Sequence, residues 1–349
     1  MEEYVEAVIN NVKFKIQSSK FKVQDFKVKT IYFGGGTPSL MPVYLLEKIW
    51  NTIFENFEVD AEAECTIEVN PEQCTLEHLS EIKKIGFNRI SIGIQSFNDA
   101  ILHFLGRTHS AKEAQRAIEN AQRSGFENIS IDLMYGIYLR SVQDWKKELK
   151  TVFNLPVKHL SAYSLTVEEN TLLHKKIIQQ KIPNIDEEQS LNEMKLLMDE
   201  TEKACFEQYE VSNFALKGYH SKHNFNYWNG TRYLGFGASA HSYSGITRSW
   251  NISNVEKYIQ ALQDDKPFFE EEYLTPDNQY NEYVLLRLRT KEGIDLKLLE
   301  ERFGTEKLNF FLKSLQQINS RYYEHQSHHI SITKEGLPLL DFITTNLLF

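Results

Sequence analysis

Short apolar segments alternate with amphipathic segments along the first half of the chain, and this alternation limits its fold more than any other feature. Strands separated by single helices can pair in parallel through helical crossovers. The sequence therefore predicts an α/β fold built on a parallel sheet. Strands are predicted at TIYF, CTIEV, RISIGI, ISIDLM and HLSAYSL, and helices near 43–55, 76–85, 111–123 and 142–152.

Local boundary signals support these helices and divide the chain. Ser110 and Glu113 have the spacing of a capping box, and Gly86 and Gly125 stand where the helices before them should end. A helix near 187–206 precedes the strand YEVSNFA, and the residues from Gly218 to Trp250 show no clear period. We expect a barrel core at 1–215, a glycine-rich and aromatic segment at 216–275, and a domain of helices with a short strand pair at 276–349.

Composition excludes several classes of protein. The chain has 349 residues, 41% of them hydrophobic, which is enough to bury a large core. Its net charge is -9 and no segment concentrates Lys and Arg, so a nucleic-acid partner is not expected. No window approaches the roughly 18 apolar residues of a membrane span, and the N-terminus has no apolar signal core. We expect a cytoplasmic protein.

The predicted strands carry a polar face. Glu68, Gln95 and Asp132 alternate with aliphatic residues, as do smaller polar residues on the same strands. Because helical crossovers should cover the other face, the polar face is expected to point into a barrel interior. These three residues lie near the carboxyl ends of their strands, where barrel enzymes place their sites. The alternative is a polar network that satisfies itself without a ligand.

A glycine run follows the first of these strands. Gly34, Gly35 and Gly36 precede Thr37 and Pro38, so backbone amides could approach a ligand closely. The spacing is neither GxGxxG nor GxxxxGK[ST], which excludes the dinucleotide and P-loop motifs. A tight turn between strand and helix is the alternative explanation.

Histidines in two segments are considered as candidate ligands. The stretch SKHNFNYWNGTRYLGFGASAHSY holds His223 and His241 among aromatic residues. Imidazole can bind haem iron and aromatic rings can stack on a flat macrocycle, whereas a histidine held by hydrogen bonds in a packed loop is the alternative. His325, His328 and His329 in EHQSHH are interpreted as exposed polar side chains without a second set of ligands.

Seven segments match one protein family in order and at fitting spacing: IYFGGGTPSL, CTIEVNPE, RISIGIQSFNDAILHFLGRTHS, ISIDLMYGI, YEVSNFA, HNFNYW and YLGFGASAHSY. They resemble the radical S-adenosylmethionine (SAM) proteins of the oxygen-independent coproporphyrinogen III oxidase family, most of all its haem chaperone branch. The resemblance runs from about residue 3 to the C-terminus. It implies a partial (β/α)6-type barrel without its first strand, followed by a small winged-helix-like α+β domain.

The resemblance also implies binding residues, carried over by motif. Glu68 and Asp132 can accept hydrogen bonds from an ammonium group or ribose hydroxyls, and Arg107 can pair with a carboxylate in a fork geometry. HNFNYW matches a motif associated with haem, which implies His223 as an iron ligand. The implied SAM contacts are Gly35, Gly36, Thr37, Glu68, Gln95, Arg107 and Asp132, and the implied haem contacts are His223, Asn224, Tyr227 and Trp228.

One departure from the family is large. Its members begin with a barrel strand and a CxxxCxxC loop that holds a [4Fe-4S] cluster, and this sequence starts after that segment. Its three cysteines, Cys65, Cys74 and Cys205, form no such motif and agree with a reducing compartment. Radical cleavage of SAM is therefore not expected. The explanations are a late gene start, a fragment, or a natural non-radical relative, in that order.

Three functions follow from the resemblance. The favoured one is a haem-binding chaperone that transfers haem to acceptor haemoproteins, with SAM and haem as ligands. The second is a coproporphyrinogen III oxidase whose radical chemistry is lost in this chain, and the third is a degenerate SAM binder that serves as an interaction module. The favoured function is compatible with transient contacts to a membrane or a respiratory protein.

Overall fold

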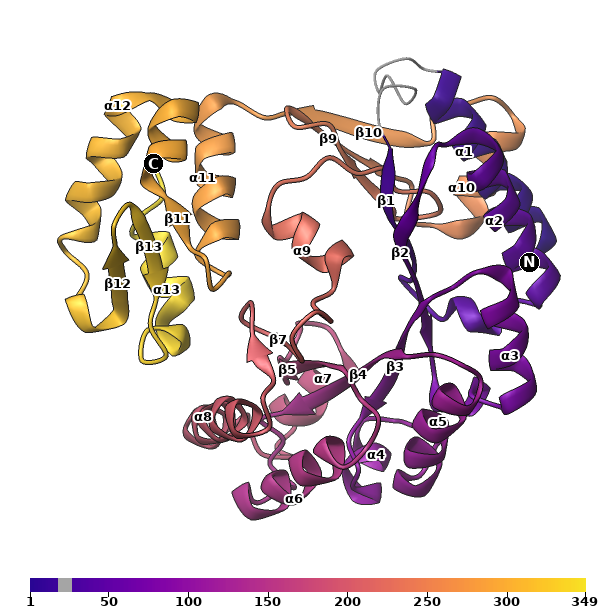
Figure 1. Ribbon diagram of the computed structural model, residues 1–349, viewed down its shortest axis with the longest axis horizontal. Helices are drawn as coiled ribbons and strands as arrows, with labels where there is room; N and C mark the ends of the chain where they lie inside the picture. The colour runs from indigo at the N-terminus through magenta and orange to yellow at the C-terminus, as the bar shows by residue number, and fades with distance from the viewer. Residues whose placement is uncertain (18–26) are drawn as a thin grey trace. The chain divides into compact units, whose positions relative to one another are not determined.

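A seven-stranded sheet forms the main element of the computed structural model, which describes residues 1–17 and 27–349 (Figure 1). The strand order is β1-β2-β3-β4-β5-β7-β6. Strands β2 to β5 pair in parallel, and β7 is antiparallel to both β5 and β6. The predicted α/β class is confirmed. The strands are β1 (Val28–Phe33), β2 (Val59–Val69), β3 (Arg89–Gln95), β4 (Asn128–Tyr135), β5 (His159–Ser164), β6 (Glu207–Gln208) and β7 (Asn213–Ala215).

The chain divides into two compact units. Unit 1 comprises Met1–Ile31, Met41–Glu64 and Lys222–Phe349, and unit 2 comprises Tyr32–Leu40 and Cys65–Ser221. Strands β1 and β2 contribute residues to both units. The boundaries predicted from sequence at 215/216 and 275/276 stay a prediction.

Helices cover the strands of unit 2, and their ends are set by local capping. In α5, the hydroxyl of Ser110 accepts a bond from the N–H of Glu113, whose carboxylate accepts the N–H of Ser110 at 2.7 Å, as predicted. Gly86 and Gly125 follow α3 and α5 with φ values of 129° and 90°, a conformation that favours glycine. The helices of unit 2 are α3 (Leu76–Ile85), α4 (Asp99–Phe104), α5 (Ala111–Arg123), α6 (Val142–Phe153), α7 (Leu172–Ile178) and α8 (Glu187–Lys203).

The core of unit 2 lies between its strands and its helices. Alternate residues of β3 and β4 are aliphatic and completely buried, among them Ile90, Ile92 and Ile131. Helices α5 and α8 contact these strands. Burying each such side chain stabilises the fold by about 1.5–3 kcal/mol. The residues between them, such as Ser91 and Asp132, therefore face the opposite side of the sheet.

Unit 1 contains the N-terminal helix and the C-terminal domain. Val5, Val8, Ile9 and Val12 of α1 (Glu2–Gln17) are buried, and α1 contacts α2 (Val43–Asn56) and α10 (Val255–Gln263). Two three-stranded sheets occur here, with orders β10-β9-β8 and β11-β13-β12. The remaining elements are α9 (Lys222–Trp228), β8 (His241–Tyr243), β9 (Thr247–Asn251), β10 (Phe269–Tyr273), α11 (Pro276–Arg287), β11 (Ile294–Asp295), α12 (Leu296–Leu315), β12 (Tyr323–Gln326), β13 (His329–Ile332) and α13 (Leu340–Thr345).

The stretch from Gly218 to Trp250 differs from expectation because it holds α9, β8 and most of β9. Its elements have seven, three and five residues, and the seven residues of α9 are fewer than the window of about 11 residues in which a helical period is detected. None of the helices within residues 1–17 and 27–349 combines the length and the apolar character that a membrane crossing needs.

Candidate functional site

The turn after β1 brings a backbone amide to the carboxylate of Glu68. The hydroxyl of Tyr32 donates to Oε1 of Glu68 at 2.7 Å, and the N–H of Gly35 donates to Oε2 at 3.1 Å. A Cβ on Gly34 would lie 2.5 Å from the Tyr32 ring and 2.7 Å from the Glu68 carboxyl carbon. Gly35 has φ +83°, which favours glycine. The glycine run therefore makes the turn and also permits the approach to Glu68.

A second carboxylate, that of Asp132, lies on β4. Parallel pairing aligns Glu68 with Ser91, and Asp132 with Ser161. The hydroxyl of Ser91 donates to Oδ1 of Asp132 at 3.4 Å. Burial raises the pKa of Asp132 to about 6; a hydrogen bond from Ser161 opposes this shift, and the charge of Glu68 adds to it. The two carboxylates therefore repel each other, and a cationic ligand would relieve that repulsion.

Amide side chains extend this site. Asn70 donates from Nδ2 to the hydroxyl of Thr37 at 3.1 Å. A Cβ on Gly93 would lie 3.3 Å from Nε2 of Gln95 and 3.4 Å from Oδ1 of Asn70, so both amides lie over this glycine. Gln95 has φ 68°, which is uncommon for a residue other than glycine and occurs often at functional sites. The residues that meet at these strand ends are Gly35, Thr37, Glu68, Asn70, Gln95 and Asp132.

Gly36 stands between Gly35 and Thr37 of this group, whereas Arg107 has no hydrogen bond or ion pair to it among the described residues. Nothing lies within 4 Å of a Cβ built on Gly36. Arg107 is half-buried after α4, with its N–H bound to the carbonyl of Leu102. Within the described part of the chain, no hydrogen bond or ion pair joins its guanidinium to the other predicted contacts.

Sequence reasoning missed two polar residues of this face. Burial, followed by the charge of Glu68, raises the pKa of Tyr32, so its hydroxyl remains a neutral donor. Arg89 is the first residue of β3 and is 1% exposed. Its Nε has no hydrogen-bond partner among the described residues. Every second residue of a strand lies on the same face. Tyr32 lies two positions before Gly34, and Arg89 lies two positions before Ser91, so this alternation could have identified both residues.

A second candidate region surrounds His223 on α9. Its Nδ1 lies 2.9 Å from the hydroxyl of Thr30, and its Nε2 lies 3.1 Å from the hydroxyl of Tyr227. The carboxylate of Glu64 accepts bonds from the backbone N–H groups of Lys222 and His223, each at 3.0 Å. Glu64 is buried on β2. The start of α9, and with it the His223 ring, is therefore fixed to the strands of unit 1.

Aromatic rings continue from His223 in a row. The rings of His223 and Tyr227 are perpendicular with centroids 5.1 Å apart, and those of Tyr227 and Tyr233 are 4.8 Å apart. Partial burial, followed by the neighbouring Tyr233, raises the pKa of Tyr227 to about 12. Tyr227 is therefore a neutral phenol at ordinary pH, whereas a tyrosine binds iron as the phenolate.

The other residues predicted around haem have different surroundings. The indole Nε1 of Trp228 is buried without a hydrogen-bond partner in the described residues, so it is a donor available to a ligand. Asn224 is half-buried on the same helix. His241 is exposed on β8, with its ring 6.3 Å from that of Trp250.

The cysteines do not fit an iron–sulfur cluster. Cys65 and Cys74 are buried and Cys205 is exposed. Burial raises the pKa of the Cys74 thiol, which donates to the carbonyl of Asn70 at 3.4 Å. A buried thiol of raised pKa does not supply the thiolate that a cluster requires.

One contact of the C-terminal histidines was not expected from the sequence. His328 and His329 were expected to lack further ligands, but β11 places Asp295 beside both of them. Residues 295 and 329 are paired across two strands that lie far apart in the sequence, so the period of the segment alone could not reveal the contact.

Comparison with known proteins gives consistent matches. Residues 17–152 match the Radical SAM superfamily, and residues 274–339 match the HemN C-terminal domain. The haem chaperone HemW of Bacillus subtilis (strain 168) is 33% identical over 312 residues, which is 88% of this chain and 82% of that protein. HemW of Lactococcus lactis (strain IL1403) is 31% identical over 341 residues, 97% of this chain and 87% of the relative.

A solved structure has the same fold. Coproporphyrinogen III oxidase (HemN) from Escherichia coli, a radical SAM enzyme, superimposes with a TM-score of 0.84 over 99% of this chain and 83% of that chain. The sequence identity is 21%, so the likeness shows the fold alone. It confirms the radical-SAM-type α/β fold with a small C-terminal domain.

Proposed function

We propose that this chain, which belongs to the HemW family of haem chaperones within the radical SAM superfamily, binds haem and passes it to acceptor haemoproteins. The observation that carries the proposal is the position of His223 beside a row of aromatic rings, with its imidazole against the hydroxyl of Thr30 and its backbone N–H bound to Glu64. Such a group can bind iron while the rings stack on the macrocycle.

Iron would bind to Nε2 of His223. Iron binding requires the tautomer in which Nδ1–H donates to the hydroxyl of Thr30 and Nε2 is unprotonated. The hydroxyl of Tyr227 then occupies the position of the iron and has to turn away. Tyr227 is 40% exposed, so this movement does not disrupt the core. Trp228 offers its unpaired indole N–H to the bound ligand.

The second ligand that we propose is SAM, bound at the strand ends of unit 2. SAM carries positive charge on its sulfonium and ammonium groups, and the repelling carboxylates of Glu68 and Asp132 would pair with a cation. The side chains of Asn70 and Gln95 offer hydrogen bonds to its polar groups. When bound, SAM would supply a sulfonium carbon for chemistry, and we derive no radical step because the cysteines do not fit a cluster.

A haem titration followed by transfer tests the proposed function. The chain should bind haem with a new Soret band and then release it to apomyoglobin, which serves as a general acceptor. A carrier has to do both, whereas a haemoprotein with resident haem would retain it. No Soret band, or haem that stays on the chain with excess acceptor, would rule out the carrier function.

Calorimetric titration with SAM tests the second ligand. Glu68→Gln should weaken SAM binding by about 10- to 150-fold, since it removes one charge-assisted partner worth about 1.5–3 kcal/mol. Glu62→Gln is the matched control, because Glu62 is exposed on the same strand. Equal SAM affinity in both variants would exclude Glu68 from the binding site.

A further inference from the structure

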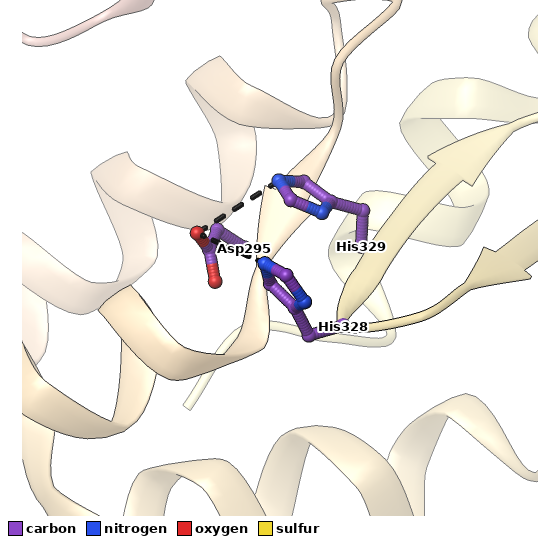
Figure 2. A group of neighbouring side chains, drawn as sticks. All are labelled: Asp295, His328 and His329. Atoms are coloured by element: carbon purple, nitrogen blue, oxygen red, sulfur yellow. Dashed lines mark ion pairs between the residues drawn. The ribbon is translucent and has the colours of Figure 1, made fainter.

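Two imidazoles and one carboxylate meet in the C-terminal domain (Figure 2). Nε2 of His328 and Nε2 of His329 each lie 3.8 Å from Oδ2 of Asp295. The ligand atoms of the three residues all lie within 4.8 Å of one another, and this is the one group of its kind among the described residues. Neither the proposed haem site nor the proposed SAM site includes these residues.

The backbone holds this group in place. Asp295 pairs with His329 across β11 and β13, and the N–H of Leu296 donates to the carbonyl of His328 at 2.8 Å. Consecutive residues of a strand point to opposite faces. His328, however, lies in the turn before β13, next to Ser327 with φ 56°. The turn therefore lets both rings face the same carboxylate, as Figure 2 shows.

The two oxygens of Asp295 have separate roles. Oδ1 accepts bonds from the backbone N–H groups of Lys297 and Leu298, at 2.9 and 3.3 Å, and so caps the start of α12. This bonding fixes the plane of the carboxylate and leaves Oδ2 toward the histidines. A ligand oxygen oriented by hydrogen bonds to its partner oxygen is the usual arrangement in metal sites.

The spacing fits a metal ion better than a direct hydrogen bond. An N–H···O bond joins atoms about 2.7–3.2 Å apart, and both Nε2···Oδ2 distances are 3.8 Å. Two ligands of a tetrahedral Zn²⁺, each about 2.0–2.1 Å from the ion, lie about 3.3 Å apart. The side chains are 31–42% exposed, so small rotations of the rings can close the difference.

We propose that Asp295, His328 and His329 bind a divalent transition metal ion of the Zn²⁺ class. Two neutral imidazoles and one carboxylate are ligands that Zn²⁺ prefers, and three protein ligands leave a fourth position for water. The ion joins the start of α12 to the turn between β12 and β13. Metal binding therefore stabilises the C-terminal domain.

The test uses the full haem-free chain without an affinity tag. Zn²⁺ is titrated by calorimetry, and Co²⁺ is added separately to record the visible absorption of tetrahedral coordination. His328→Ala, His329→Ala and Asp295→Asn should each weaken Zn²⁺ binding by at least about tenfold and abolish the tetrahedral Co²⁺ spectrum. Asparagine caps helices as well as aspartate does, so Asp295→Asn keeps the start of α12. His325→Ala is the control, because His325 is exposed on neighbouring β12 and outside the group.

Each outcome decides the proposal. Weaker binding in the three variants, an unchanged His325→Ala chain and a Zn²⁺-dependent rise in melting temperature that the variants lose would support the site. Unchanged binding in all variants would mean that the metal lies elsewhere, for example at His223. If the histidine variants lost Zn²⁺ binding while Asp295→Asn kept it, the ion would be bound by two surface histidines alone. Both of these results, and the absence of Zn²⁺ binding, overturn the three-ligand site.

Discussion

At the scale of single residues, the hydroxyl of Tyr227 competes with haem iron for the imidazole of His223. The hydroxyl of Tyr227 occupies the same ring nitrogen, Nε2, that we propose for iron. Tyr227→Phe removes this competitor, worth about 1 kcal/mol, and should therefore tighten haem binding about fivefold. Tyr233→Phe keeps the bond to His223 and serves as the control. Unchanged or weaker haem binding in Tyr227→Phe, measured by Soret titration, would exclude Nε2 as the iron ligand.

Asp132 makes stability depend on pH. Its folded pKa of about 6 lies above its ordinary value of 3.8, so the folded chain binds more protons between these values and stability falls as pH rises through them. Above about pH 6 the ionised group costs up to about 3 kcal/mol. Asp132→Asn should raise the free energy of unfolding by about 1–3 kcal/mol near pH 8, with little gain near pH 4. Denaturant titration at both pH values measures this difference.

Asp144→Asn is the control for Asp132. A hydrogen bond from Ser141, with help from Lys147, lowers the pKa of Asp144. Its neutral variant should therefore lose stability near pH 8. If Asp132→Asn also lost stability there, burial of the Asp132 charge would not be unfavourable, and the case for a cationic ligand would weaken.

The alternation of polar and aliphatic residues along one strand can identify a site residue, but it cannot identify the residues that bond to it. Glu68 and Asp132 were predicted because every second residue of a strand shares a face. The anchors of His223 were missed, since Thr30 and Glu64 are separated from it by more than 150 positions. No local period connects such residues, and only the pairing of strands brings them together.

At the scale of elements, α9 depends on Glu64. Glu64→Ala removes the acceptor of two backbone N–H groups and should lower the free energy of unfolding by about 1–3 kcal/mol. Haem affinity should fall as well, because His223 loses its fixed orientation. Glu62→Gln, on the same strand, should change neither quantity. If Glu64→Ala lowered the stability but left the haem affinity unchanged, the position of α9 would not matter for haem binding.

Element boundaries were predictable where capping is local. The predicted helices 76–85 and 111–123 have the same bounds as α3 and α5, because Thr75 and Ser110 begin them and glycines follow their ends. By contrast α9, β8 and β9 were missed. The seven residues of α9 are too few to show a helical period, and β8 has only three residues.

For the whole molecule, the order of motifs carried more information than any single pattern. Composition and periodicity predicted an α/β chain with polar strand ends, but neither could distinguish haem from another flat ligand. The resemblance to a family supplied that step, and relatives 31–33% identical over most of the chain agree with it. The contact of Asp295 with His328 and His329 lies outside the seven segments that carry the resemblance, and finding it required the tertiary structure.

Haem ligation by His223 is the central claim, and the absorption spectrum of the haem-loaded chain tests it most directly. His223→Ala should lose or shift the Soret band, and added imidazole should restore the original spectrum by replacing the missing ligand. His241→Ala, which removes an exposed histidine of the same segment, should keep the original band. An unchanged spectrum and haem affinity in His223→Ala would contradict the account.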